Sequence, residues 1–333
     1  MSLAIIIVSW NTRELTLRCL KSIFKSIKNI DFKVYLIDNN STDGTIEAIQ
    51  KLFGLKTGVI TNNVYVTPSF SSDRLEIIAN QENVGFAKAN NQAINLCHPR
   101  ESEDPGVNWQ TQDPRFRGDD NLFLLLNPDT ELIDDSLIKM IEFAKTNPDI
   151  GIVGPKLLNS DLTLQRSCRQ FPKLLDQLLI QLKFYNFWPE KFKAIRQYFM
   201  LDFGHHEKRE VDQVMGAAML IKKEVFDKIG LLDEKFWAIF EEVDFCKRAK
   251  DAGFQTFFYP EWQIVHHKEQ SFGQWKKLRK QINFNRSLYY YFKKHQPFWQ
   301  LFILWLAQPI NLFLTLLDSL VGVRKKAGKS KDL

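Results

Sequence analysis

The first half of the chain alternates short, wholly apolar runs with segments that have a helical period. Residues 4–9 form an apolar, β-branched run of strand length, and residues 14–27 carry apolar side chains along one stripe. The other main elements expected are strands at 33–37, 75–78, 121–126, 215–221 and 254–258 and helices at 41–52, 83–96 and 240–252. This order predicts an α/β fold with a doubly wound, mostly parallel sheet. Ligands of such sheets bind at the carboxyl ends of the strands.

Length and composition narrow the class of protein. A chain of 333 residues is long enough for about two domains. Its composition, with 44% hydrophobic and 25% charged residues, excludes a disordered or collagen-like chain. Four cysteines lie far apart and form no CxxC pair, which argues against structural zinc and fits a reducing compartment. The net charge of +6 favours an anionic partner. No basic region precedes the first strand, so no signal peptide is expected.

Two stretches interrupt the alternation. Residues 56–73 are polar and irregular, with a short strand possible at 63–67. Residues 99–120 contain three prolines and no apolar period, which predicts an exposed loop. We expect this insertion to be dispensable, and a functional lid is the alternative.

The C-terminal tail differs in kind from the rest. Residues 298–323 are mostly apolar and contain Pro309, and basic clusters lie on both sides. The segment could just cross a bilayer about 30 Å thick, but one span would put one basic cluster on the wrong side under the positive-inside rule. We therefore expect a helix pair, broken at Pro309, in the cytoplasmic interface of an anionic membrane. A true span and a helical hairpin packed on the rest of the chain are the alternatives.

Carboxylates follow two of the predicted strands. Asp38 ends the strand at 33–37, where it can accept a hydrogen bond from a ribose hydroxyl or a base imide; a turn with a helix cap is the alternative. Asp129 follows the strand at 121–126, directly after Pro128. One carboxylate plus substrate phosphates is the usual way to hold Mg²⁺. An ordinary turn before the next helix is the alternative for Asp129.

Three carboxylates open the helix at 240–252. Glu241, Glu242 and Asp244 lie beside aromatic residues, where a helix N-terminus stabilises negative charge. Asp244 and Arg248 form an i,i+4 pair, which leaves the two glutamates to face elsewhere. A carboxylate at the mouth of an aromatic-lined cleft suits a general base, and simple capping is the alternative.

Taken together, the motifs resemble the family 2 glycosyltransferases, particularly the bacterial rhamnosyltransferase-like branch. The resemblance covers roughly residues 3–275 and is carried by IIIVSWN, DNNSTDGT, ENVGFAKANNQAI, LLLNPDTEL, GPKLL, QRSCRQFP, MGAAMLIKKEVFDKIGLLDE, FEEVDFCKRAKDAGF and IVHH. It implies a GT-A fold, a nucleotide-diphosphate sugar donor and an inverting, single-displacement transfer. It also implies a glycosyltransferase domain over 1–275, while the apolar segment and its basic flanks predict a membrane-associating helical tail over 276–333.

The resemblance also assigns residues to the donor site. The implied nucleotide-binding residues are Ser9, Asn11, Asp38, Asn83, Gly85, Asn91 and Asn127. Asn127 and Asp129 occupy the place of the family's Asp-x-Asp, so a single carboxylate must carry the metal, Mg²⁺ or Mn²⁺. His266 resembles a histidine that completes the metal and diphosphate site, with His267 as the fallback.

The catalytic base implied by the resemblance is Glu242. The family more often has Asp at this place, so Glu241 and Asp244 remain possible substitutes. The implied substrates are a nucleotide-diphosphate sugar, with deoxythymidine-diphospho-rhamnose as the expected donor, and a lipid-linked glycan acceptor at the cytoplasmic face of the membrane. A sugar nucleotidyltransferase and a non-catalytic nucleotide-sugar-binding protein are the alternatives. Nucleic acid is a poor partner because the basic residues gather in the tail.

Overall fold

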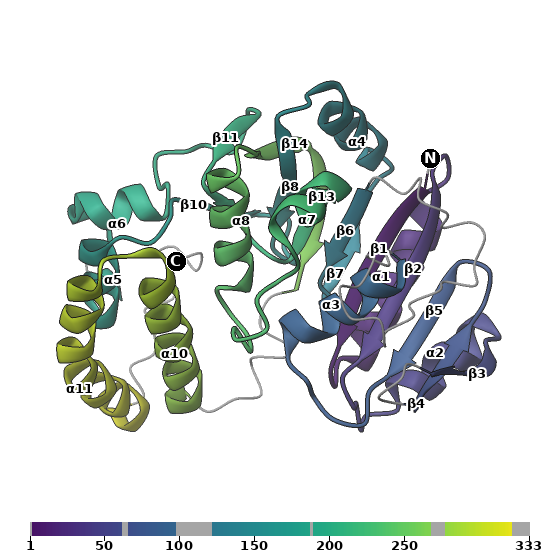
Figure 1. Cartoon of the computed structure of the whole chain (residues 1–333), viewed down its shortest axis with the longest axis horizontal. Coiled ribbons are helices and arrows are strands. Elements are labelled where there is room, and N and C mark those ends of the chain that lie inside the picture. Colours follow the sequence, from purple (N-terminus) through teal and green to yellow (C-terminus); the bar gives the residue numbers. More distant parts are fainter. Residues whose placement is uncertain (1, 62–65, 98–121, 187–188, 268–276, 322–333) are drawn as a thin grey trace.

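The computed structural model describes residues 2–61, 66–97, 122–186, 189–267 and 277–321. A large twisted sheet occupies the centre, helices cover both of its faces, and a pair of helices lies at one end (Figure 1). The predicted insertion at 99–120 lies outside the described residues.

Within these ranges the main sheet has twelve strands, and its central strands are parallel. The main path runs β11-β14-β8-β13-β6-β1-β2-β5-β4-β3. Strand β1 pairs in parallel with β2 and β6, and β2 pairs in parallel with β5, whereas β13 is antiparallel to β6 and β8. The strands are β1 (Ser2–Ser9), β2 (Asp31–Asp38), β3 (Lys56–Thr61), β4 (Val66–Ser71), β5 (Leu75–Ala79), β6 (Leu122–Leu126), β7 (Thr130–Leu132), β8 (Ile150–Leu158), β9 (Leu164–Gln165), β11 (Arg209–Val211), β13 (Ala218–Lys222) and β14 (Gln255–His266), with β10 (Cys168–Arg169) and β12 (Gln213–Val214) in a separate pair. The expected α/β architecture is confirmed.

The helices cover the sheet on both sides. They are α1 (Arg13–Ser26), α2 (Thr45–Phe53), α3 (Phe86–Cys97), α4 (Leu137–Thr146), α5 (Leu174–Gln181), α6 (Lys193–Tyr198), α7 (Lys223–Ile229), α8 (Glu241–Asp251), α10 (Lys277–His295) and α11 (Phe298–Val321), with short 3₁₀ turns at Phe184–Asn186 and Pro189–Lys191. One core cluster joins α1, α2 and α4 to the sheet, and a second joins α3, α7 and α8. The side chains of β1 between its terminal serines belong to these clusters in alternation: Ile5 and Ile7 to the first, Ile6 and Val8 to the second. This two-sided burial explains why the interior of β1 is apolar.

Two predictions of secondary structure are corrected. The stretch at 56–73, which was expected to be largely irregular, contains the antiparallel strands β3 and β4. The last strand, expected at 254–258, continues to His266 because β14 pairs first with β8 and then also with β7. The register of β14 shifts between Tyr259 and Gln263, around Pro260, and this irregularity hides the strand in the sequence pattern.

The tail forms two antiparallel helices, α10 and α11, and the expected break at Pro309 is wrong. Helix α11 continues through Pro309, and the chain turns instead between His295 and Phe298. A proline inside a helix costs about 3 kcal/mol, and buried contacts on both sides of it hold α11 together. Leu301 and Leu304 are buried before the proline, and Asn311 after it hydrogen-bonds Asn285 and the carbonyl of Gln181.

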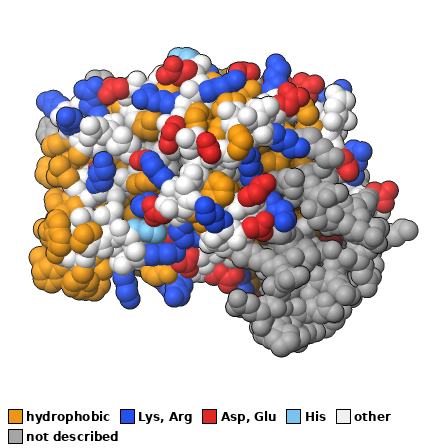
Figure 2. Space-filling view, turned by 45° about the horizontal axis from the view of Figure 1, so that its top comes forward, with side chains coloured by type: hydrophobic (Ala, Val, Ile, Leu, Met, Phe, Trp, Pro, Cys, Tyr) orange, Lys and Arg blue, Asp and Glu red, His pale blue; other side chains and the backbone are white. Residues whose placement is uncertain are grey.

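The outer face of α11 is apolar and exposed. Its exposed members are Phe298, Trp299, Phe302, Trp305, Leu306, Ile310, Phe313, Leu316 and Leu317. Figure 2 shows hydrophobic side chains gathered at the left edge of the molecule, the side on which Figure 1 places α11. By length and composition this helix could cross a membrane. Less than a third of its most apolar part is buried in the protein.

Candidate active site

The strands β1, β2 and β5 end together, and the predicted nucleotide residues begin at this edge. Ser9 pairs with Asp38, whose own carbonyl accepts the backbone N–H of Asn80. The Ser9 hydroxyl is buried against those of Thr12 and Thr16, at 3.4 and 3.2 Å. The side chain of Ser9 therefore packs against the start of α1 and positions the strand end.

Asp38 is buried and shapes the loop that follows it. Its carboxylate accepts the backbone N–H of Ser41 at 2.8 Å and the Ser41 hydroxyl at 2.6 Å. Burial raises the pKa of Asp38, against the lowering effect of these hydrogen bonds. These hydrogen bonds are the ones expected if Asp38 shapes a turn, which was the alternative to binding a nucleoside. Asn11 has a left-handed backbone conformation. It supports the same loop through its Oδ1, which accepts the N–H of Thr42 at 2.8 Å.

The start of α3 is docked on the loop that leads to α8. Gly85 has φ of +88°, and a Cβ there would lie 2.8 Å from the carbonyl oxygen of Trp237. That carbonyl accepts the N–H of Phe86 at 3.0 Å, while Asn83 Oδ1 accepts the N–H of Gly85. Only glycine combines this backbone conformation with this close approach. Asn83 and Gly85, which are predicted to bind the nucleotide, therefore hold the start of α3 next to the loop that leads to α8.

Asn91 makes a second link between the same two elements. Its amide nitrogen donates to the carbonyl of Leu232 at 2.9 Å and to Glu234, and its oxygen accepts the N–H of Leu232 at 3.1 Å. The residue is buried. The side chain of Asn91 thus holds the loop before α8 in place.

Asp129 and His266 meet at the far ends of β6 and β14. Asp129 Oδ1 lies 3.3 Å from His266 Nε2, and both side chains are more than 90% buried. The backbone brings them together, since β7 pairs with β14 at Thr130 and His266, and the N–H of His267 donates to the carbonyl of Asp129. The structure therefore places the two residues predicted to hold a metal side by side.

Gln165 determines how His266 presents its ring, and sequence reasoning missed this residue. Gln165 is fully buried; its amide nitrogen donates to Asn159 Oδ1 and to the carbonyl of His266, so its Oε1 is left to accept from His266 Nδ1 at 2.6 Å. With the proton on Nδ1, Nε2 is the ring nitrogen that faces Asp129. A polar residue inside the QRSCR motif was the available signal.

The pair fits a hard divalent cation. Asp129 Oδ1 is buried and has no hydrogen-bond partner in the described part of the chain. A carboxylate oxygen and a ring nitrogen that face each other at 3.3 Å could both serve as ligands of one cation. Within the described ranges no group of three or more His, Cys, Asp or Glu side chains is arranged around a cation, so its other ligands would come from substrate phosphates and water.

His267, the fallback ligand, has both ring nitrogens engaged elsewhere. Its Nε2 lies 2.8 Å from Glu131 Oε1, and its Nδ1 lies 2.7 Å from the hydroxyl of Ser160. These contacts favour His266 over His267 as the ligand.

Glu241 and Glu242 open α8 directly after two residues with positive φ, Ile239 and Phe240. The Oε2 atom of each glutamate is buried without a hydrogen-bond partner among the described residues. Burial raises the pKa of Glu242, and burial together with the nearby charge of Glu242 raises the pKa of Glu241 well above its usual range. An unpaired carboxylate with a raised pKa is suited to taking a proton.

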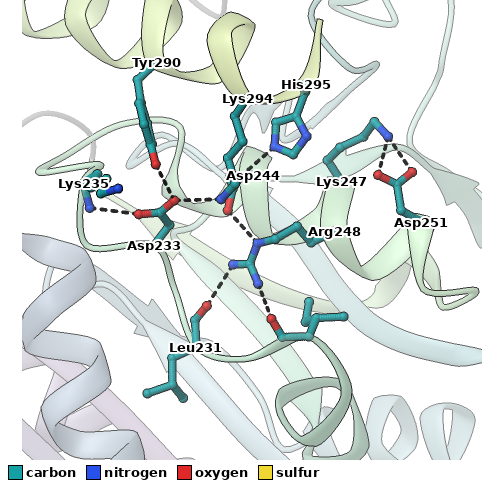
Figure 3. A network of polar contacts seen from close by, with 11 residues as sticks. Leu231, Asp233, Lys235, Asp244, Lys247, Arg248, Asp251, Tyr290, Lys294 and His295 are labelled. Atoms are coloured by element: carbon teal, nitrogen blue, oxygen red, sulfur yellow. Dashed lines mark hydrogen bonds and ion pairs between the residues drawn. The ribbon is translucent and has the colours of Figure 1, made fainter.

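Asp244, in contrast to the two glutamates, has a partner for each carboxylate oxygen (Figure 3). Its carboxylate is fully buried and lies 2.7 Å from Arg248 Nε, 2.8 Å from Lys294 Nζ and 2.7 Å from His295 Nε2. Burial alone would raise its pKa, but the hydrogen bond from His295 and the adjacent cations lower it to about 2. A carboxylate held by two cations and a histidine is a weak base, so Asp244 ties α8 to α10.

Lys294 extends this network to the loop before α8. It also contacts Asp233 at 2.7 Å, and Tyr290 donates to the same carboxylate at 2.9 Å. Figure 3 shows these groups joining α10 to α8 and the loop at 231–235.

The backbone brings the Asp129 region next to Glu242. The N–H of Asn127 donates to the carbonyl of Ala217 at 2.9 Å, which continues the pairing of β6 with β13. Gly216 precedes Ala217 and lies against Glu242, because a Cβ on Gly216 would be 3.5 Å from that of Glu242. Asn127 thus connects the two carboxylate sites at one end of the sheet.

Known proteins are similar to this chain in sequence and in fold. A mycobacterial N-acetylglucosaminyl-diphospho-decaprenol L-rhamnosyltransferase (Mycobacterium tuberculosis) is 26% identical over 243 residues, covering 72% of this chain and 68% of its own. The low-salt glycan biosynthesis hexosyltransferase Agl10 of Haloferax volcanii is 27% identical over 38% of this chain and 36% of its own.

A solved mannosyltransferase from Pyrobaculum calidifontis, in complex with GDP-Man and Mn²⁺, matches 99% of this chain and 76% of its own with a TM-score of 0.50 and 15% identity. This likeness supports the predicted GT-A fold. A family model described as glycosyltransferase like family 2 matches residues 2–283. Since that match covers most of its 333 residues, the chain belongs to the family 2 glycosyltransferases.

Proposed function

We propose that this protein is an inverting glycosyltransferase that moves a sugar from a nucleotide-diphosphate donor to a hydroxyl of a cell-envelope glycan. The observation that carries the proposal is that two carboxylate sites with different surroundings lie at one end of the sheet. Asp129 faces His266 as a cation site, and Glu242 has an unpaired oxygen and a raised pKa. A transfer with inversion needs one base and one stabilised leaving group, which is what these two sites supply.

In this reaction the acceptor oxygen attacks the anomeric carbon as the bond to the nucleoside diphosphate breaks. Glu242 accepts the hydroxyl proton, and the diphosphate leaves with the bonding electrons. Asp129 and His266 would hold Mg²⁺ or Mn²⁺, whose charge would offset the negative charge that develops on the leaving group. Gln165 keeps His266 oriented for this role.

The names of the relatives support a choice of donor and acceptor. The mycobacterial relative is named as a rhamnosyltransferase acting on a diphospho-decaprenol-linked sugar, and the Pyrobaculum protein was solved with Mn²⁺. We propose deoxythymidine-diphospho-rhamnose as the donor and a lipid-linked glycan as the acceptor. The nucleoside would occupy the edge formed by Ser9, Asn11 and Asp38.

A panel of nucleotide sugars tests the donor assignment. We expect deoxythymidine-diphospho-rhamnose with Mn²⁺ to raise the melting temperature more than uridine- or guanosine-diphosphate sugars, because a ligand stabilises the state that binds it. The shift should shrink in EDTA and in Asp129→Asn. A larger shift with another donor would refute the rhamnose assignment, and no shift with any donor would argue against the transferase.

We also propose that the protein lies on the cytoplasmic face of an anionic membrane through α11. The exposed apolar face of this helix, the basic residues before it at 293–295 and those after it at 324–326 support this arrangement. Because Leu301 and Leu304 are buried against α10, the helix lies on the protein and offers only its outer side to lipid.

Replacing the outer side of α11 should release the protein from membranes. We expect Phe302→Gln, Leu306→Gln and Phe313→Gln together to abolish flotation with vesicles of phosphatidylglycerol and phosphatidylethanolamine, because about 0.8 kcal/mol of hydrophobic stabilisation is lost for each buried CH₂ removed. The control changes three exposed apolar residues elsewhere, Leu52, Ile133 and Leu162, to Gln. Equal flotation of the two triple variants would contradict the proposal.

A further inference from the structure

A groove of about 470 Å³ lies between the first half of α10 and the loop before α8. Its lining combines two guanidinium groups with apolar and aromatic surface. The residues are Trp237, Leu278, Arg279, Ile282, Asn283 and Arg286. None of them belongs to the donor or metal sites described above.

The two arginines are placed to act together. Arg279 and Arg286 are seven residues apart, so they lie on one face of α10 about 10 Å apart along its axis. Both are exposed, and Ile282 between them is 50% exposed. Guanidinium groups bind phosphate oxygens through paired hydrogen bonds, so two of them suit a diphosphate. Leu278 and Ile282 offer hydrocarbon surface beside these charges.

The groove borders the site of transfer. Trp237 lines it and also accepts the N–H of Phe86 at the start of α3. Four residues further along the chain, α8 begins with Glu241 and Glu242. A ligand held by the groove therefore approaches the predicted base from the side of α10.

The groove is also next to the apolar helix of the tail. Lys277 at the start of α10 contacts Asp318 near the end of α11 at 3.1 Å, and Asn285 hydrogen-bonds Asn311. The second half of α11, which exposes Ile310, Phe313 and Leu317, thus lies along the half of α10 that bears the groove. Hydrocarbon leaving the groove can continue onto this surface.

We propose that the groove binds the acceptor by its diphosphate and the first units of its polyprenyl chain. This inference rests on the proposed function, and it identifies which part of the lipid-linked acceptor is recognised. Arg279 and Arg286 bind the diphosphate, Leu278, Ile282 and Trp237 contact the chain, and the sugar projects toward Glu242. The mixture of charge and apolar surface matches a lipid diphosphate better than a neutral glycan.

The test compares two acceptors that share a sugar. One is farnesyl-diphospho-N-acetylglucosamine, and the other is the uncharged octyl N-acetylglucosaminide. For Arg279→Ala with Arg286→Ala, we expect KM for the diphosphate acceptor to rise at least about tenfold, because each lost charge-assisted hydrogen bond is worth about 1.5–3 kcal/mol. KM for the octyl glycoside and the donor Kd should not change. For Arg279→Lys with Arg286→Lys, KM for the diphosphate acceptor should lie between that of the unmodified protein and that of the double alanine variant. The lysines keep the charge but cannot form the paired hydrogen bonds of a guanidinium group.

A charge-matched control removes two exposed lysines elsewhere, Lys51→Ala and Lys145→Ala, and should leave both KM values unchanged. Equal losses with both acceptors, or no loss with either, would overturn the groove assignment, as would a rise in the donor Kd. Failure of the unmodified protein to transfer to any acceptor despite binding the donor would count against the proposed function instead.

Discussion

Glu242→Gln should lower kcat by at least about 10²-fold while the Kd for the donor stays unchanged. The glutamine keeps the shape of the side chain but cannot take the acceptor proton. Because burial raises the pKa of Glu242, the folded protein holds this proton more tightly than the unfolded chain does. The ionised carboxylate therefore destabilises the fold as the pH rises, and we expect Glu242→Gln to raise the melting temperature at pH 8.

This combination separates a lost base from a damaged fold. Steady-state kinetics, donor binding by calorimetry and thermal unfolding would be measured on one preparation. Glu241→Gln is the matched control, since its carboxylate is also buried with an unpaired oxygen. If Glu242→Gln retained normal turnover while Glu241→Gln lost it, Glu241 would be the base.

Asp244→Asn should destabilise the protein by about 3 kcal/mol, the lower end of the range for breaking a buried ion pair. The change leaves Arg248, Lys294 and His295 around a neutral amide, and the carboxylate they lose is fully buried. We place the effect at the lower end because Arg248 and Lys294 are partly exposed to water. Urea unfolding measures it. Asp251→Asn is the control on the same helix, because the exposed pair with Lys247 is worth at most about 1 kcal/mol.

The effect of Asp244→Asn should depend on pH in a defined direction. The folded pKa of about 2 lies below the ordinary value of about 3.9, so the ionised group stabilises the fold above about pH 4. That contribution falls as the pH drops through 3.9 and is gone below about 2. The stability difference between the unmodified protein and the variant should therefore narrow between pH 6 and pH 3. A constant difference over this range would mean that packing, and not charge, accounts for the loss.

The alternation of apolar runs and helical segments was enough to predict the sheet, and it placed the candidate site residues at the strand ends. The interior of strand β1, from Leu3 to Val8, is apolar because it is covered on both faces, and the residues after β1, β2 and β6 lie at strand ends. In a parallel sheet these ends share an edge. The prediction failed where pairing interrupts the pattern, as in β14, whose register shifts around Pro260.

Side-chain partners distant in the sequence could not be predicted in this way. Gln165 and His266 are about a hundred residues apart, yet their hydrogen bond orients the ring toward Asp129. The sequence predicted the pair of Asp244 with Arg248, but only the fold shows that α10 adds Lys294 and His295 to Asp244. None of the described residues donates a hydrogen bond to Oε2 of Glu242.

The amino-acid pattern therefore predicted the α/β architecture, because periodicity is a local property of the chain. The resemblance of its motifs indicated the family and a short set of candidate site residues. The folded structure decided which carboxylate is ion-paired and which is left unpaired, and it showed that α11 passes through Pro309. These outcomes depend on contacts between segments far apart in the chain. Burial, the local electric field and the supply of hydrogen-bond partners arise only from such contacts.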